Sequence, residues 1–254
     1  MKIYMLSGHR TATIVVPCFN EARRLRLDRF REYLRDSPDV AILFVNDGSR
    51  DETASLIRKF QAETGPQAGL LDSARNQGKA EAVRQGMLQA LAQGVRFVGF
   101  WDADLATPLT AIPDFLELLE ARPEIQMVFG ARVKLLGRDI ERRAVRHYLG
   151  RAFATCASIV LRLPVYDTQC GAKIFRVTNL LPGLLAEPFR SRWIFDVELI
   201  ARFIRATGNA AEAGRGIYEF PLREWVDVAG SKVRPKDFVR AFGELAAIWL
   251  KYRT

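Results

Sequence analysis

The feature that most constrains the fold is an alternation in the first half of the chain, where short apolar runs are separated by longer amphipathic stretches. This alternation is typical of βαβ units in a mainly parallel sheet. The apolar runs predict strands at residues 12–17, 40–45, 69–72, 95–101 and 125–130. We therefore expect an α/β fold with a mainly parallel central sheet flanked by helices.

Helices are expected between these strands. The first follows the turn at 17–21 and ends near residue 34, and the second has Asp51 as its N-cap. The third spans residues 78–93. The fourth begins at Thr107-Pro108, a pair with cap and first-turn chemistry. After residue 130 the pattern predicts a long helix at 140–161, a loop and strand at 165–175, a helix at 195–205, a strand at 216–221 and a terminal helix at 235–252. No repeat or linker separates the halves, so we expect one domain over residues 1–254 with a helical C-terminal part.

Composition excludes several classes of protein. The 254 residues are 49% hydrophobic and 26% charged, unlike a disordered or disulfide-stapled chain. Residues 85–95 form the longest stretch without a charge, well short of the ~20 apolar residues that a membrane-spanning helix needs. Residues 1–10 lack the pattern of a secretory signal, so we expect a cytoplasmic protein. Cys18, Cys156 and Cys170 lack C-x-x-C spacing and indicate neither a zinc site nor a disulfide framework.

The chain is basic, with a net charge of +9. This charge favours an acidic partner such as a nucleotide, a phosphate, nucleic acid or an anionic membrane surface. Much of it lies in residues 132–151, whose cations are Arg132, Lys134, Arg138, Arg142, Arg143, Arg146 and Arg151. The segment is either a solvated basic face or an anion pocket for a second, phosphorylated substrate. In the second interpretation Arg132 points toward the nucleotide site. His147 shares a helical face with Arg143.

Two carboxylates follow the fourth predicted strand directly, in Asp102-Ala103-Asp104. At this spacing they can converge on one cation, and their hard oxygen atoms suit Mg²⁺ or Mn²⁺ bridging a diphosphate. The structural alternative is a pair of solvated carboxylates or a cap for the next helix. The turns after parallel strands emerge at the carboxyl edge of the sheet, where open α/β folds bind ligands.

Other polar turns are expected at the same edge. Asp47 could accept a hydrogen bond from a base or a ribose hydroxyl, or its turn could be an Asx-type turn with Gly48 at positive φ. Asn20 and Glu21 offer the same chemistry after the first strand. Arg75 and Lys79 flank a helix start that could bind phosphate. The chain contains no P-loop or G-x-G-x-x-G motif.

Eight segments in order between residues 13 and 233 resemble family 2 inverting glycosyltransferases of the GT-A fold. They are Val16-Pro17-x-x-Asn20-Glu21, Val45-Asn46-Asp47-Gly48-Ser49-x-Asp51, Arg75-Asn76-x-Gly78-Lys79, Asp102-Ala103-Asp104-Leu105-Ala106-Thr107-Pro108, Gly130-Ala131-Arg132, Asp167-Thr168-Gln169-Cys170-Gly171-x-Lys173-x-Phe175, Phe195-Asp196-Val197-Glu198 and Gly230-Ser231-Lys232. Among these enzymes the chain resembles polyprenol-phosphate sugar transferases, and dolichyl-phosphate β-glucosyltransferases more than mannosyl enzymes.

The resemblance implies transfer of a hexose, with UDP-glucose as the favoured donor, to a dolichyl or undecaprenyl phosphate. The alternatives are a GDP-mannose donor, or a hydroxyl acceptor with Asp167 or Asp196 as general base. A non-catalytic nucleic-acid-binding protein is disfavoured, because acidic strand ends would repel a phosphate backbone. The implied division is a nucleotide-sugar half at 11–131, an acceptor half at 132–233 and an amphipathic helix at 234–254.

The resemblance also assigns roles to single residues. The implied catalytic residues are Asp102, Asp104, Arg132 and Asp196, of which Asp102 and Asp104 hold Mg²⁺ or Mn²⁺. The implied nucleotide-sugar residues are Pro17, Asn20, Glu21, Asp47, Arg75, Lys79, Asp102, Ala103 and Gln169. The implied acceptor-phosphate residues are Arg132, Arg143, Arg146, His147 and Lys173.

The chain departs from the family pattern at three points. Asn46 replaces the first acid of the usual D-D-G-S motif, and Ala106 stands where mannosyl relatives have a Gln. The C-terminal membrane helices of many relatives are missing. The apolar stripe of the terminal helix predicts either docking on the core or peripheral contact with the inner face of a membrane. Asp196 could also be the N-cap of its helix.

Overall fold

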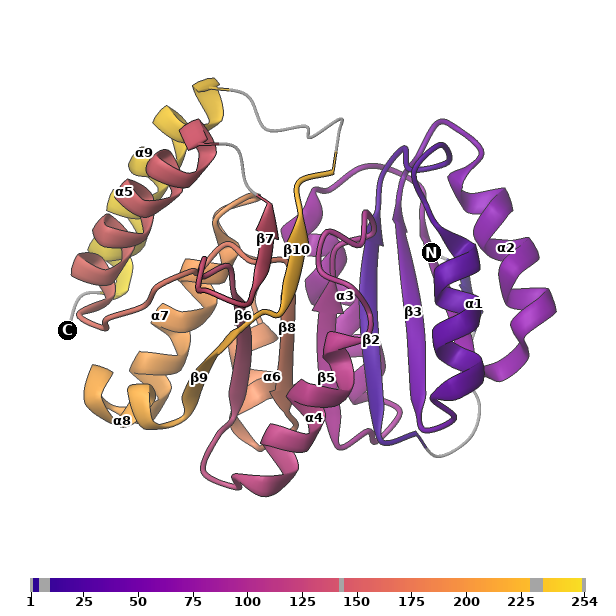
Figure 1. The fold of residues 1–254 in the computed structure, drawn as a ribbon, viewed down its shortest axis with the longest axis horizontal. Coiled ribbons are helices and arrows are strands. Elements are labelled where there is room, and N and C mark those ends of the chain that lie inside the picture. The colour runs from indigo at the N-terminus through magenta and orange to yellow at the C-terminus, as the bar shows by residue number, and fades with distance from the viewer. Residues whose placement is uncertain (1, 5–9, 142–143, 229–234, 253–254) are drawn as a thin grey trace.

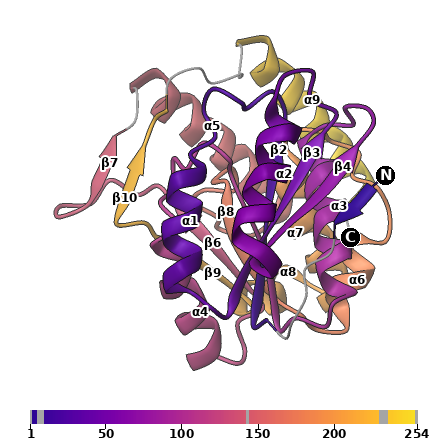
Figure 2. The same cartoon turned by 90° about the vertical axis from the view of Figure 1, so that its right-hand side faces the viewer.

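The computed structural model describes residues 2–4, 10–141, 144–228 and 235–252, and the side chains of 10–141, 148–228 and 240–252. Within this part of the chain, helices cover both faces of one large sheet (Figures 1 and 2). The predicted α/β fold with a mainly parallel central sheet is confirmed. No helix among the described residues is long and apolar enough to cross a membrane.

The large sheet has the strand order β1-β4-β3-β2-β5-β8-β6-β9. Only β1 and β8 run antiparallel to their neighbours. The strands are β1 (Lys2–Tyr4), β2 (Ala12–Cys18), β3 (Val40–Asp47), β4 (Ala68–Ser73), β5 (Phe97–Trp101), β6 (Met127–Ala131), β8 (Ala172–Arg176) and β9 (Ile217–Pro221). The β8 strand joins the two halves of the chain, because it pairs with β5 on one side and β6 on the other.

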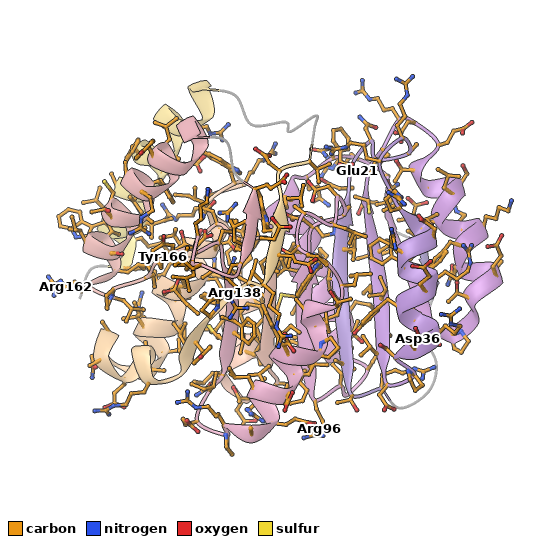
Figure 3. All side chains as sticks on the ribbon, in the orientation of Figure 1. Glu21, Asp36, Arg96, Arg138, Arg162 and Tyr166 are labelled. Atoms are coloured by element: carbon orange, nitrogen blue, oxygen red, sulfur yellow. The ribbon has the colours of Figure 1, made fainter. Side chains whose placement is uncertain are left out.

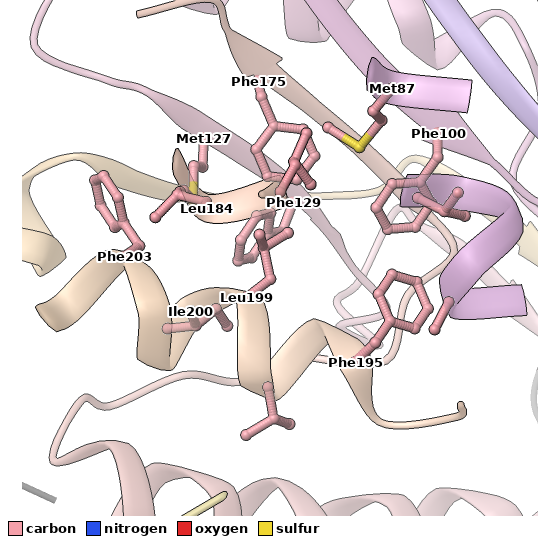
Figure 4. Packing of buried hydrophobic residues seen from close by; sticks show 14 of the residues in the cluster. Met87, Phe100, Met127, Phe129, Phe175, Leu184, Phe195, Leu199, Ile200 and Phe203 are labelled. Carbon is pink, nitrogen blue, oxygen red and sulfur yellow. The ribbon is translucent and has the colours of Figure 1, made fainter. Parts of the chain in front are cut away.

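Two apolar layers hold the helices against the sheet, because neighbouring residues of a strand face opposite sides. Val15 of β2 belongs to the layer under α3, α5, α6, α7 and α9, and its neighbour Val16 belongs to the layer under α1, α2 and α4. Figure 4 shows the first layer, where the rings of Phe100 and Phe195 pack with centroids 5.5 Å apart. The helices are α1 (Leu27–Asp36), α2 (Thr53–Thr64), the 3-10 turn η1 (Gly65–Gln67), α3 (Lys79–Leu91), α4 (Ala111–Ala121), α5 (Ala144–Leu161), α6 (Leu180–Leu185), α7 (Phe195–Thr207), α8 (Ala210–Arg215) and α9 (Pro235–Tyr252).

Two predicted helix starts were wrong. Ile140 lies in a short strand, β7 (Asp139–Glu141), and α5 begins only at Ala144. The β7 strand pairs with β10 (Glu224–Val226), which buries Ile140 against Trp225. The fourth helix begins at Ala111 rather than at Thr107, whose carbonyl oxygen accepts a hydrogen bond from Nε1 of Trp101 at 2.8 Å.

The start of α2 differs by one residue from the prediction. The helix begins at Thr53 and its N-cap position is Glu52 rather than Asp51. The Asp51 carboxylate nevertheless accepts a hydrogen bond from the Thr53 backbone N–H at 3.1 Å. The predicted capping chemistry is therefore present one position earlier than a regular N-cap.

Candidate active site

A cavity of about 510 Å³ opens at the carboxyl edge of β2, β3 and β5 and receives residues from both halves of the chain. Figure 3 shows Glu21 at this edge and Arg96 at the opposite one. Many of the predicted site residues line the cavity, namely Pro17, Glu21, Asp47, Lys79, Asp102, Ala103, Asp104, Arg132, Gln169 and Asp196. The fold thus brings together residues that are up to 179 positions apart.

The two carboxylates of the D-x-D segment lie where β5 ends. The Asp102 backbone N–H donates to the Gly171 carbonyl at 2.9 Å, which extends the pairing of β5 with β8 by one residue. The chain then turns through Leu105, which has a φ of 54°, and Asp104 accepts a hydrogen bond from the Ala106 N–H at 3.2 Å. Burial, and next the charge of Asp102, raise the pKa of Asp104.

Gly171 is required for the position of the Asp102 side chain. A Cβ atom at residue 171 would lie 1.9 Å from Oδ2 of Asp102, far inside van der Waals contact. Any other residue at this position would therefore displace the carboxylate. Sequence analysis placed Gly171 in a motif without giving it this role, because a contact between two strands is not visible in one sequence.

Lys79 binds the other oxygen of the same carboxylate. Its Nζ lies 2.5 Å from Oδ1 of Asp102, and both side chains are about one-third exposed in the cavity. Burial alone would lower the pKa of Lys79, but the charges of Asp102 and Asp196 outweigh it and the pKa is raised. Lys79 is therefore a cation held directly beside the acidic pair.

The donor set at this edge suits a divalent ion that is shared with a ligand. Asp102 and Asp104 offer carboxylate oxygens, the ligands that Mg²⁺ and Mn²⁺ prefer. Among the described residues no group of three or more His, Cys, Asp or Glu side chains could hold a metal. Ala106 cannot contribute a side-chain ligand, so an ion here would need a phosphate or water to complete its shell.

Asp47 holds the loop that precedes α3. Its Oδ1 accepts from the Gln77 N–H, and its Oδ2 accepts from the Gly78 N–H and from Nδ2 of Asn76, each at 2.8 Å. Gly48 has the predicted positive φ, and a Cβ there would lie 2.4 Å from the carbonyl carbon of Arg75. The predicted Asx-type turn is made by Asn46, whose Oδ1 accepts from the Ser49 N–H at 3.3 Å. Asp47 lies on the cavity wall and positions Lys79 through the loop before α3.

The structure explains why Asn46 departs from the family pattern. Its Nδ2 donates to Oδ1 of Asp72 at 2.7 Å, and Asn46 is buried. A carboxylate at residue 46 would face the Asp72 carboxylate at this distance, and like charges in contact repel. The amide is therefore the group that fits beside Asp72.

Arg132 is held by Asp167 and by an aromatic ring. Its Nε and Nη2 donate to the two Asp167 oxygens at 2.6 and 2.7 Å, and its guanidinium carbon lies 5.2 Å from the centre of the Trp225 ring. Burial lowers the pKa of Arg132, but the Asp167 charge overcomes this and the pKa is raised. Asp167 does not line the main cavity, which disfavours it as a general base.

Lys173 is not placed as an acceptor-phosphate ligand. Its side chain is fully buried, and its Nζ lies 2.6 Å from Oδ1 of Asp196 and donates to the Thr168 carbonyl at 3.0 Å. The sequence pattern gave no sign that this lysine points into the protein. Asp196 lines the cavity above it and is not an N-cap, since that position of α7 is Ile194. Burial raises the pKa of Asp196 against the opposing charges of Lys173 and Lys79.

Two expected donor residues lie outside the cavity wall. Asn20 is exposed with a φ of 51°, and its Oδ1 accepts from the Arg50 N–H at 2.8 Å, so it braces the neighbouring turn. Arg75 is exposed, because the loop that Asp47 holds directs Lys79 rather than Arg75 to the cavity. Among the acceptor residues, Arg143 and the side chains of Arg146 and His147 lie outside the described residues.

The basic segment reaches the cavity only in part. Arg132 lines it, but Lys134 is exposed and Arg151 stacks on Tyr166, with its guanidinium carbon 3.8 Å from the ring centre. Sequence analysis also missed an apolar wall, formed by Phe153 of α5, Trp193 and Trp225. Aromatic residues in loops and short strands have no periodic pattern that would assign them to a site.

Sequence analysis also missed the contacts that hold Trp193. Glu198 is fully buried and its Oε2 accepts from the Arg190 N–H at 2.7 Å, while its Oε1 accepts from Arg202 at 2.9 Å. The Ser191 hydroxyl accepts from the Trp193 N–H at 3.1 Å. The Phe-Asp-Val-Glu segment thus supplies both a cavity residue, Asp196, and the anchor of the loop before it.

A mainly parallel α/β sheet whose carboxyl edge combines an acidic pair, cations and a large cavity fits a nucleotide-sugar transferase of the GT-A class. Solved structures share this fold. Glucosyl-3-phosphoglycerate synthase from Mycobacterium tuberculosis, in complex with Mn²⁺, UDP and glucosyl-3-phosphoglycerate, has a TM-score of 0.66 and 19% identity over 96% of this chain and 80% of that one. A mannosyltransferase from Pyrobaculum calidifontis, in complex with GDP-Man and Mn²⁺, has a TM-score of 0.59 and 19% identity over 96% of this chain and 64% of that one.

The chain belongs to glycosyl transferase family 2, whose family model matches residues 13–179. It is a hexosyltransferase that uses a nucleotide sugar. Dolichyl-phosphate beta-glucosyltransferases are among its relatives. One of them, from Trichomonas vaginalis, is 30% identical over 95% of this chain and 71% of the relative. Another, from Drosophila melanogaster, is 30% identical over 94% of this chain and 74% of the relative.

Proposed function

We propose that this enzyme transfers glucose from UDP-glucose to a polyprenyl phosphate, with inversion at the anomeric carbon. The observation that carries the proposal is that Asp102, Arg132 and an aromatic wall line one cavity. An acidic pair suits the metal-bound diphosphate of a donor, and a guanidinium beside aromatic rings suits a phosphate with an apolar tail. The names of the relatives support glucose as the transferred sugar and dolichyl phosphate as the acceptor. UDP-glucose as donor is supported by glucosyl-3-phosphoglycerate synthase, whose structure was solved with UDP-glucose and Mn²⁺.

We propose that residues 11–131 bind the donor. Pro17, Glu21 and Asp47 line the part of the cavity for uridine, and Lys79 binds the diphosphate. Asp102 and Asp104 would hold Mg²⁺ or Mn²⁺, which would supply positive charge to the leaving UDP. Gln169 and Asp196 line the cavity from the other half and would contact the sugar hydroxyls.

The proposed reaction is a single displacement. An oxygen of the acceptor phosphate forms a bond to the anomeric carbon while the bond from this carbon to UDP breaks, and UDP leaves with the electron pair. A phosphate monoester with a second pKa of ≈ 6 is largely dianionic at neutral pH and needs no general base. The ion pairs of Asp167 with Arg132 and of Asp196 with Lys173 support a mechanism without a general base. Arg132 would orient the acceptor, within the proposed acceptor half at 132–233.

The test compares donors and acceptors directly. Purified enzyme with Mn²⁺ is assayed with UDP-glucose or GDP-mannose, and with a polyprenyl phosphate, phosphoglyceric acid or an alcohol as acceptor. We expect turnover with UDP-glucose and polyprenyl phosphate and at least tenfold less with every other pair, a difference of about 1.4 kcal/mol in transition-state binding. Equal use of an alcohol would contradict the proposed acceptor, and preference for GDP-mannose would contradict the donor.

A further inference from the structure

The loop at residues 165–170, between α5 and β8, carries two of the proposed site residues. Asp167 binds Arg132, and Gln169 lines the cavity. A loop holds a side chain precisely only when further contacts fix its own backbone. The position of Arg132 therefore depends on the groups that bind the backbone of the 165–170 loop.

Glu219 of β9 binds the first part of the 165–170 loop. Its Oε1 accepts from the Asp167 N–H at 2.7 Å and from the Tyr166 N–H at 2.9 Å, and its Oε2 accepts from the Tyr166 N–H at 2.8 Å. Hydrogen bonds to a carboxylate are stronger than those between neutral groups. Burial raises the pKa of Glu219, while the two N–H groups favour its charged form. One carboxylate thus fixes two consecutive peptide groups.

Lys173 of β8 binds the second part of the same loop. Its Nζ donates to the carbonyl oxygens of Thr168 and Cys170, at 3.0 and 2.5 Å. Phe129 of β6 lies between Lys173 and Glu219, because the register of the sheet pairs it with both. Directly paired residues of neighbouring strands share one face of the sheet. The loop is therefore held over this face by an anion on one side of Phe129 and a cation on the other.

We infer that Glu219 is a positioning residue for Arg132. Glu219 holds the backbone of Asp167, whose carboxylate accepts from Nε and Nη2 of Arg132 at 2.6 and 2.7 Å and from the Arg132 backbone N–H at 3.2 Å. Glu219 does not line the cavity, so it acts through Asp167 and not on a substrate. The inference rests on the proposed function, in which Arg132 orients the acceptor phosphate.

Steady-state kinetics of Glu219→Ala and Glu219→Asp test the inference. The first variant removes the acceptor of both N–H groups, and the second keeps the charge but shortens the side chain by one methylene group. We expect the KM for polyprenyl phosphate to rise roughly tenfold in the first and roughly threefold in the second, because a small misplacement of an orienting group is costly. The affinity for UDP with Mn²⁺ should stay within about twofold, since no contact between UDP and this loop is proposed.

The matched control is Glu224→Ala, which removes an exposed carboxylate from the neighbouring strand β10. It should leave the acceptor KM and the UDP affinity unchanged. An unchanged acceptor KM in both Glu219 variants, or an equal loss of UDP and acceptor binding, would overturn the inference. If Glu219→Ala does not fold, Glu219→Asp decides the result.

A double-variant cycle separates positioning from a general loss of stability. Glu219→Ala should lower kcat/KM for the acceptor in the unchanged enzyme and change it by less than about twofold in Arg132→Gln, because residues that act through one another do not give additive effects. Glu219→Asp takes its place in the cycle if needed. Independent losses that multiply in the double variant would contradict the positioning role.

Hydrogen exchange distinguishes failure of this inference from failure of the proposed function. Amides of the 165–170 loop should exchange faster in Glu219→Ala than in the unchanged protein, and those of β2 and β3 should not change. If the enzyme uses a phosphorylated acceptor other than polyprenyl phosphate, the proposed function fails, and a rise in KM for that acceptor in Glu219→Ala keeps the role of Glu219. If the enzyme uses polyprenyl phosphate and the variant changes neither exchange nor KM, only the inference fails.

Discussion

At the scale of single residues, the proposed donor site depends on how Asp102 is held. Gly171 leaves space for one carboxylate oxygen, and Lys79 binds the other at 2.5 Å. A divalent ion on Asp102 therefore competes with Lys79, unless a diphosphate offers the ammonium group a new partner. This geometry links metal binding to donor binding through one lysine.

The glycine contact predicts the effect of Gly171→Ala. The added methyl group would displace the Asp102 carboxylate while the strands stay paired, so the affinity for Mn²⁺ in the presence of UDP should fall by roughly 10- to 100-fold, as for other losses of metal-ligand support. Calorimetry measures the affinity and thermal unfolding checks the fold. The control is Gly183→Ala, where a Cβ would meet nothing within 4 Å. Unchanged Mn²⁺ binding in the Gly171 variant would contradict the contact.

The lysine contact predicts opposite effects of Lys79→Gln on two ligands. Without UDP, Mn²⁺ should bind up to about fivefold more tightly, since a partly exposed ion pair contributes up to ~1 kcal/mol. UDP should bind more weakly, because its diphosphate loses a cation. The control is Arg24→Gln, which removes a cavity cation that pairs with Glu21 at 2.7 Å instead of with Asp102. An equal gain in Mn²⁺ affinity in both variants would contradict the prediction, because it would show that the gain comes from the change in net charge and not from the contact between Lys79 and Asp102.

At the scale of elements, the antiparallel strand β8 supports the cavity from below. It places Lys173 beneath Asp196 at the start of α7, in an ion pair whose lysine also lies 5.2 Å from the centre of the Phe100 ring. Removing one partner of a buried pair leaves the other charge uncompensated, which costs about 3–5 kcal/mol. The pair therefore matters for stability as well as for the shape of the site.

This arrangement predicts that Lys173→Met lowers the free energy of unfolding by about 3 kcal/mol. The double variant Lys173→Met with Asp196→Leu should recover much of the loss, because it removes both charges. Urea unfolding measures the two changes. If the single variant were as stable as the unchanged protein, Lys173 would not be the buried counter-ion of Asp196.

The elements differ in how far the sequence predicts them. The strands of the first half are buried on both faces, so their apolar runs are clear and their ends place the polar turns correctly. The strands β7 and β10 have three residues each and no periodic signal, which is why Ile140 was assigned to a helix. The direction of a side chain is also absent from sequence, which therefore did not show that Lys173 is buried or that Arg75 lies outside the cavity wall.

At the scale of the whole molecule, one cavity receives residues from both halves of the chain, where we propose the two substrate sites. The donor residues follow β2, β3 and β5, and Arg132 follows β6 on the far side of β8. The loop that holds Arg132 is bound in turn by Glu219 of β9, the last strand of the sheet. The apolar stripe of α9 docks on the core through Ala241, Leu245 and Ile248, and contact of this helix with a membrane stays a prediction.

The central claim is that Asp102 and Asp104 bind a divalent ion together with the diphosphate of the donor. Calorimetry of UDP with and without Mn²⁺, on the unchanged protein and on Asp104→Asn, tests it most directly. We predict that Mn²⁺ strengthens UDP binding at least tenfold in the unchanged protein and has no effect in the variant. Equal UDP affinity with and without Mn²⁺, or the same enhancement in Asp104→Asn, would contradict the claim.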